Sequence, residues 1–203
     1  MEVLNVVKEI GLVPVVVFKS TDEVDNVMTA LIEGDVKIAE ICFRTDCAEE
    51  AIKIAAKKYS DVLVGAGTVI NKEQCEAAIK AGAKFIVSPG FSDGVYEVCV
   101  KNNIPYLPGV VTPTEIMHAL DLGIKVVKFF PAGVFGGLKA IKALGAAFPQ
   151  VKFMPTGGVD NSNLKEFIAC DKIIACGGSW LLKGTHEEIV KTCLEARKIV
   201  KGE

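Results

Sequence analysis

Eight apolar segments of strand length alternate along this chain with eight polar segments of helical periodicity. The strand-like segments are residues 13–18, 36–43, 62–64, 85–88, 104–107, 124–130, 151–154 and 172–176. The helix-like segments are residues 22–33, 48–58, 72–81, 94–102, 113–122, 138–148, 162–169 and 186–200. This alternation favours parallel strands covered by helices. Eight such units predict a closed (β/α)8 TIM barrel rather than an open doubly wound sheet, which usually has fewer strands.

A barrel of this kind can occupy the whole 203-residue chain, so we expect residues 1–203 to form a single domain. The amphipathic segment up to Ile10 precedes the first predicted strand. We therefore expect an extra N-terminal helix that covers the bottom of the barrel.

Composition excludes several classes of partner. Half of the residues are hydrophobic and the formal net charge is only −2, so no nucleic-acid partner is expected. The apolar runs are shorter than the roughly 18 residues of a membrane span. The N-terminal segment has no basic region or small-residue cleavage site, which predicts a cytoplasmic protein.

The seven cysteines form no C-x-x-C pair and no cluster with histidine, so we expect reduced, buried thiols and no metal. His118 and His186 fall in helix-like segments and receive no chemical role.

Lys128 is a charged residue inside a strand-like apolar run, residues 124–130. Because side chains alternate along a strand, Val126, Lys128 and Phe130 share one face, and Lys128 has no simple path to water. Burial of a lysine favours the neutral amine, which is the nucleophile of Schiff-base enzymes. Lys128 is therefore the first candidate for a catalytic residue.

The second predicted strand ends with Glu40, Cys42 and Arg44 on one face. In a barrel, active sites lie at the carboxyl ends of the strands, so Glu40 and Arg44 would point toward the mouth. The alternative is a Glu–Arg pair on a solvated edge or an internal salt bridge. Only two arginines occur in the chain, Arg44 and Arg197, and a guanidinium binds carboxylates bidentately. We expect Arg197, in the last helix, to be solvated.

Glycine pairs follow the last two predicted strands, at Gly157-Gly158 and Gly177-Gly178, the latter followed by Ser179. Backbone N–H groups in such loops bind phosphate, and a short helix from Ser179 would add its dipole. The alternative for each glycine pair is a tight turn. A similar loop, with Thr68 at its end, is predicted after the third strand.

Seven ordered motifs together resemble the 2-keto-3-deoxy-6-phosphogluconate (KDPG) aldolase family. They are EICFRT (40–45), VGAGTV (64–69), VSPG (87–90), PGVVTPTE (108–115), KFFPA (128–132), PTGGV (155–159) and GGSWL (177–181). The resemblance spans nearly the whole chain. It implies a class I, metal-independent, cofactor-free and usually trimeric aldolase that overlaps in activity with 4-hydroxy-2-oxoglutarate (KHG) aldolase.

The resemblance also implies roles for individual residues. Lys128 matches the Schiff-base lysine and Glu40 the general acid and base. The pyruvate end matches Arg44, Thr68, Pro89 and Phe130. The phosphate and sugar end matches Thr156, Gly157, Gly158, Gly177, Gly178 and Ser179.

Cys42 and Gly133 depart from the pattern, which often has threonine and glutamate there. Neither departure removes a catalytic group. The sequence leaves open the preference among KDPG, its galactonate epimer and KHG. Two other functions also stay open: a sugar-phosphate isomerase or epimerase, which leaves Lys128 unexplained, and a noncatalytic phosphate-ligand binder, against which Glu40, Lys128 and Arg44 all count.

Overall fold

The computed structural model describes residues 2–203. Its strands are β1 (Leu12–Val16), β2 (Ile38–Cys42), β3 (Leu63–Gly67), β4 (Ile86–Val87), β5 (Tyr106–Leu107), β6 (Gly109–Val110), β7 (Val126–Phe129), β8 (Lys152–Pro155) and β9 (Cys176–Gly178). Its helices are α1 (Glu2–Ile10), α2 (Glu23–Glu33), α3 (Ala48–Lys58), α4 (Lys72–Ala81), α5 (Asp93–Lys101), α6 (Pro113–Asp121), α7 (Gly137–Ala147), α8 (Leu164–Ile168) and α9 (His186–Lys201), with a 3₁₀ turn at Trp180–Leu182. The predicted α/β alternation of strands and helices is confirmed.

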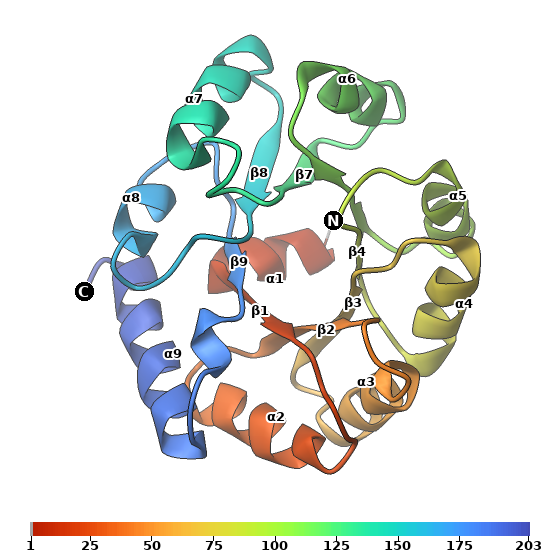
Figure 1. Ribbon diagram of the computed structural model, residues 1–203, viewed down its shortest axis with the longest axis vertical. Coiled ribbons are helices and arrows are strands. Elements are labelled where there is room, and N and C mark those ends of the chain that lie inside the picture. The colour runs from red at the N-terminus through yellow and green to blue at the C-terminus, as the bar shows by residue number, and fades with distance from the viewer. Residues whose placement is uncertain (1) are drawn as a thin grey trace.

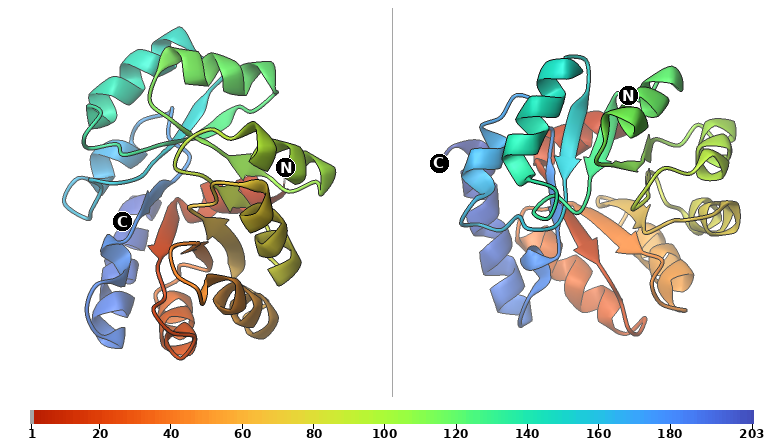
Figure 2. Two further views of the ribbon diagram at one scale, coloured as in Figure 1. Left: turned by 45° about the vertical axis from the view of Figure 1, so that its right-hand side comes forward. Right: turned by 45° about the horizontal axis from the view of Figure 1, so that its top comes forward.

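The strands form two parallel sheets. One has the order β5-β4-β3-β2-β1-β9 and the other the order β6-β7-β8. Between β5 and β6 stands Pro108, which has no N–H to donate. Isolated parallel bridges, Phe153 with Ile173 and Thr156 with Gly177, join β8 to the segment around β9. Figure 1 shows the strands at the centre and the helices α2 to α9 around them, and Figure 2 shows the same arrangement from two further directions.

The strands are buried on both faces, which explains why their sequences are continuous apolar runs. The largest fully buried side chains include Phe18, Phe85, Phe129 and Phe153. The Phe85 ring lies against the backbone of Gly65, where a Cβ atom would approach it to 2.3 Å. A glycine is therefore required inside β3 by close packing rather than by a turn.

Two predicted strands end at other residues than expected. We expected strand three to end at Val64 and a glycine loop to follow, but β3 continues to Gly67. The last strand was expected over residues 172–176, but β9 covers Cys176–Gly178 and pairs with β1 through Val13 and Pro14. Gly177 and Gly178 are therefore strand residues, and neither the expected loop after the strand nor the alternative tight turn begins at them.

Helix α1 precedes β1 and lies near the starts of β2 and β3. Its residues Val6, Glu9 and Ile10 line a cavity of about 580 Å³ together with residues at the starts of β2 and β3. Arg197 of α9 donates to the carbonyl oxygens of Glu9 and Ile10 and to Asp35 Oδ2.

The expectation that Arg197 is solvated was wrong, because its side chain is only 11% exposed. Its face of α9 packs toward α1, and a long arginine side chain can bury its stem while its guanidinium meets carbonyl oxygens. In the described part of the chain, no helix is long and apolar enough to cross a membrane.

Candidate active site

A buried ion pair joins β7 to β2 across the interior. Lys128 Nζ donates to Glu40 Oε1 at 3.2 Å, and the side chains are 3% and 0% exposed. The two strands are not neighbours in either sheet, so the side chains meet because both point inward. Removing one partner of such a pair leaves an uncompensated buried charge, which typically costs about 3–5 kcal/mol. Lys128 and Glu40 are thus coupled in both stability and chemistry.

Glu40 retains one carboxylate oxygen for chemistry. Oε2 is buried and has no hydrogen-bond partner among residues 2–203. An unsatisfied buried acceptor costs about 1–3 kcal/mol, so this oxygen is suited to accept a proton, or a hydrogen bond from a hydroxyl group, of a bound molecule. The Lys128 ammonium also lies 5.1 Å from the centre of the Phe130 ring.

Gly67 makes room for the Glu40 carboxylate. A Cβ atom at position 67 would lie 2.3 Å from Glu40 Oε1, which is closer than real atoms approach. Gly67 pairs with Cys42 in the parallel register between β2 and β3. The glycine motif after Val64 therefore positions a catalytic candidate.

Arg44 and Thr68 meet at the carboxyl ends of β2 and β3. Arg44 Nε donates to Thr68 Oγ1 at 2.9 Å, while the Arg44 side chain remains exposed. Thr68 has a φ of 55°, a left-handed conformation that costs a β-branched residue about 1–3 kcal/mol. The Nε bond leaves the terminal guanidinium nitrogens of Arg44 directed to another acceptor, and a carboxylate matches that geometry.

Cys42 lies beside this group. Burial, and then the charge of Glu40, raises the pKa of the Cys42 thiol to about 11. The thiol is therefore protonated at neutral pH and does not compete with an amine as a nucleophile. The replacement of threonine by cysteine keeps a small neutral group beside Glu40.

A cavity of about 480 Å³ lies beside Arg44 and Phe130. Its lining includes seven predicted site residues, namely Arg44, Phe130, Thr156, Gly157, Gly158, Gly178 and Ser179. Of the remaining five predicted residues, Lys128 lies beside Phe130 and binds Glu40, Thr68 binds Arg44, and Gly177 pairs with Thr156, while Pro89 is linked to the group through Gly109. The carbonyl oxygen of Pro89 lies against Gly109, which pairs with Lys128 in the register of β6 and β7.

The glycines after β8 form the predicted loop. Gly157 and Gly158 have φ angles of 86° and 84°, a conformation that side-chain-bearing residues rarely adopt. Gly133 N donates to Gly157 O at 2.9 Å, and a Cβ atom at Gly133 would lie 3.3 Å from Gly158 Cα. The departure at Gly133 thus allows the loop after β7 to pack closely on the glycine loop.

Gly177 and Gly178 serve packing at the other side of the cavity. A Cβ atom at Gly177 would lie 2.4 Å from Thr156 Oγ1, a buried hydroxyl without a hydrogen-bond partner in the described residues. Trp180 Nε1 donates to Asn161 Oδ1 at 2.9 Å and ties the loop after β9 to the loop after β8. The helix expected from Ser179 is only the three-residue 3₁₀ turn.

The donor groups near the cavity are not arranged for a metal. Among residues 2–203, no group of three or more histidine, cysteine, aspartate or glutamate side chains is placed to hold a metal ion. A buried lysine paired with a carboxylate, at the ends of parallel strands, is typical of an enzyme of the Schiff-base lyase class.

Comparison with known proteins identifies the family. The family model for KDPG and KHG aldolase matches residues 3–193. The chain is 41% identical to the 2-dehydro-3-deoxy-phosphogluconate aldolase of Treponema pallidum (strain Nichols) over 180 residues, which cover 89% of this chain and 86% of that protein. The chain belongs to the KDPG and KHG aldolase family.

Two solved structures are similar over nearly their full length. The KDPG aldolase of Zymomonas mobilis ZM4, solved with 3-phosphoglycerate, has 35% identity and a TM-score of 0.93 over 98% of this chain and 96% of that one. The KDPG aldolase of Legionella pneumophila, with pyruvate captured as a covalent carbinolamine intermediate, has 33% identity and a TM-score of 0.87 over 100% and 98%. The resemblance read from the sequence motifs is therefore confirmed.

Proposed function

We propose that this protein is a class I aldolase that cleaves KDPG to pyruvate and glyceraldehyde 3-phosphate and also acts on KHG. The observation that carries the proposal is the buried contact of 3.2 Å between Lys128 Nζ and Glu40 Oε1. Membership of the KDPG and KHG aldolase family supports it. A sugar-phosphate isomerase or a noncatalytic binder would have no use for this pair.

The substrate carboxylate binds Arg44 and Thr68 at the ends of β2 and β3. Pro89 and Phe130 enclose the same three-carbon end. The phosphate binds the backbone and hydroxyl donors of Gly157, Gly158, Gly178 and Ser179, with Gly177 beneath them. The hydroxyl of Thr156 is then placed for a hydroxyl of the sugar chain, and by the family resemblance it favours the gluconate epimer.

The reaction begins when Lys128 passes a proton to Glu40 and the resulting neutral amine attacks the C2 ketone to form a carbinolamine. Glu40 moves the protons that allow water to leave, and an iminium results. The positive nitrogen withdraws electrons, so removal of the C4 hydroxyl proton by Glu40 breaks the C3–C4 bond and releases the aldehyde. The enamine left on Lys128 is protonated at C3, and water adds to C2 to release pyruvate and the free amine.

We also propose that the two parallel sheets together form one closed (β/α)8 barrel. This barrel is a single catalytic domain over residues 1–203, and α1 is its extra helix. The bridges between β8 and β9 support closure on one side, and Pro108 accounts for the interruption between β5 and β6 on the other. A homotrimer in the cytoplasm completes the proposal, with the reduced thiols as support for a reducing compartment.

A coupled assay for pyruvate release tests the function. KDPG is expected to give the highest kcat/KM, above its galactonate epimer and above KHG, and added chelator is expected to change nothing. Lys128→Ala should abolish pyruvate release while the circular dichroism spectrum stays that of the wild type. Equal kcat/KM for KDPG and KHG contradicts the assigned phosphate site, and full activity of Lys128→Ala contradicts the mechanism.

A further inference from the structure

Lys183 lies at the rim of the site cavity, outside the seven motifs. It directly follows the 3₁₀ turn Trp180–Leu182 and lines the cavity together with Gly158, Asp160 and Ser179. It also lines a neighbouring cavity of about 630 Å³ beside the loop after β1. Within residues 2–203, no carboxylate is near enough to form an ion pair with its ammonium group.

The glycine loops supply dipoles to a phosphate but no full positive charge. Among the residues that line the cavity, only Arg44, Asp160 and Lys183 carry a charge. Arg44 is bound to Thr68 at the proposed pyruvate end. Lys183 is therefore the one cation that this lining offers to the phosphate end.

Asp160 places a negative charge on the same cavity lining. Its carboxylate accepts hydrogen bonds from the backbone N–H and the hydroxyl of Ser162, and the hydroxyl bond is the main cause that holds the pKa of Asp160 below its usual value. The carboxylate thus stays ionised at neutral pH and repels a phosphate dianion. The positive charge of Lys183 attracts the Asp160 carboxylate and further lowers the pKa of Asp160.

We propose that Lys183 is a specificity-determining residue that binds the substrate phosphate and gives the enzyme its preference for phosphorylated keto acids. The inference rests on the proposed aldolase function. A lysine ammonium serves as a point charge for phosphate, while the glycine N–H groups orient it. Because the contact lies far from the reacting carbon, it stabilises the bound substrate and the transition state alike, which affects KM rather than kcat.

Steady-state kinetics of Lys183→Met and Lys183→Arg test this inference, with Lys165→Met as the matched control. Lys165 is exposed on α8 and does not line the cavity. We expect Lys183→Met to raise KM for KDPG about tenfold at unchanged kcat, the effect of losing one charge-assisted contact. Lys183→Arg should restore most of the loss, and Lys165→Met should leave KM unchanged.

Two further measurements separate phosphate binding from a structural role. The same six-carbon keto acid without its phosphate should give equal KM values in the wild type and Lys183→Met. Added NaCl should raise KM for KDPG more in the wild type than in this variant, because salt screens the exposed charge. Equal KM changes with both substrates, or a fall in kcat in place of a rise in KM, overturns the inference.

Deuterium exchange at the pyruvate methyl group distinguishes this inference from the proposed function. The exchange needs the amine and the proton-transfer group but no phosphate, so Lys183→Met should exchange at the wild-type rate. A wild type that neither exchanges nor releases pyruvate overturns the proposed function. A wild type that does both, with Lys183→Met identical to it in KM, overturns the role of Lys183 alone.

Discussion

At the residue scale, the proposed chemistry depends on a carboxylate that fits only because its neighbour has no side chain. Glu40 lies in the space where a Cβ atom of residue 67 would stand. The carboxylate is fully buried and is held by its bond to Lys128 Nζ. A single methyl group at position 67 must therefore shift Glu40.

Gly67→Ala should lower kcat/KM for KDPG about 100-fold, because a displacement of about 1 Å in a catalytic group has an effect of this size. The measurement is the coupled pyruvate assay together with a thermal melt. Gly145→Ala is the control, since the atoms nearest its Cβ atom would be those of the flexible Lys172 side chain, and Gly145 does not line the cavity. Wild-type activity of Gly67→Ala would contradict the positioning role of Gly67.

Residue types alone predict much of the candidate site from the sequence. A lysine in an apolar strand, and the spacing of Glu40 and Arg44, predicted side chains that the structure brings into one region. Gly67 was missed as a positioning residue because a glycine motif reads as a loop when strand pairing is unknown. Lys183 was missed because exposed lysines are common and charge alone does not indicate a site.

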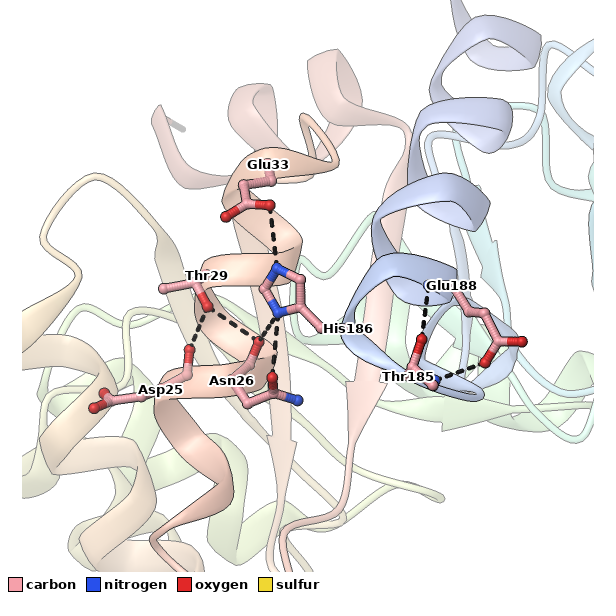
Figure 3. A network of polar contacts seen from close by, with 7 residues as sticks. All are labelled: Asp25, Asn26, Thr29, Glu33, Thr185, His186 and Glu188. Carbon is pink, nitrogen blue, oxygen red and sulfur yellow. Dashed lines mark hydrogen bonds and ion pairs between the residues drawn. The ribbon is translucent and has the colours of Figure 1, made fainter.

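At the element scale, α9 is fixed by its first turn. Thr185 and Glu188 form a capping box, and His186 reaches across to α2 (Figure 3). His186 Nε2 lies 3.1 Å from Glu33 Oε2, and Nδ1 lies 3.2 Å from the backbone and side-chain oxygens of Asn26. The hydrogen bond with Glu33 raises the pKa of His186 above its ordinary value.

This shift predicts a pH-dependent contribution to stability. A raised folded-state pKa means that the contribution is fully present below the unfolded pKa, about 6.5, and is lost as pH rises through the folded pKa. The difference in melting temperature between the wild type and His186→Gln should be larger at pH 5.5 than at pH 8.5.

Glu33→Gln is the matched control, because it removes the charge that holds the proton on His186. It should show the same loss of melting temperature at pH 5.5 and little change at pH 8.5. A loss for His186→Gln that is equal at the two pH values would mean that the ion pair with Glu33 does not stabilise the fold.

Elements were predicted unevenly, and the errors have physical causes. Helices α3 and α4 have the predicted bounds because amphipathic periodicity is a local property of the sequence. Strand β9 was misplaced because its glycines are extended only through pairing with β1, which lies at the other end of the chain. Pairing between distant segments is not visible in a single local pattern.

At the scale of the whole molecule, the contacts that hold α1 and the residues of the candidate site lie at opposite ends of the strands. At the amino end, Arg197 of α9 donates to the carbonyl oxygens of Glu9 and Ile10 in α1 and to Asp35 in the loop after α2. The carboxyl end holds Lys128, Arg44 and the glycines that line the cavity. Substitutions at the amino end should therefore act on folding and leave catalysis unchanged.

Arg197→Met tests this separation. It should lower the free energy of unfolding by about 2–3 kcal/mol, because it leaves the carbonyl oxygens of Glu9 and Ile10 without their charged donor and removes one of the two cations, Arg197 and Lys201, that pair with Asp35. Urea unfolding followed by circular dichroism measures the change, with exposed Lys198→Met as the control. A loss of kcat/KM in folded Arg197→Met protein would contradict the separation.

The central claim is that Lys128 forms an iminium with pyruvate. Incubation with pyruvate followed by borohydride should fix one reduced pyruvate on each chain, and peptide mass spectrometry should place it on Lys128. The labelled enzyme should be inactive, and Lys128→Ala should take up no label. Full activity after this treatment, or a label on any other residue, would contradict the account.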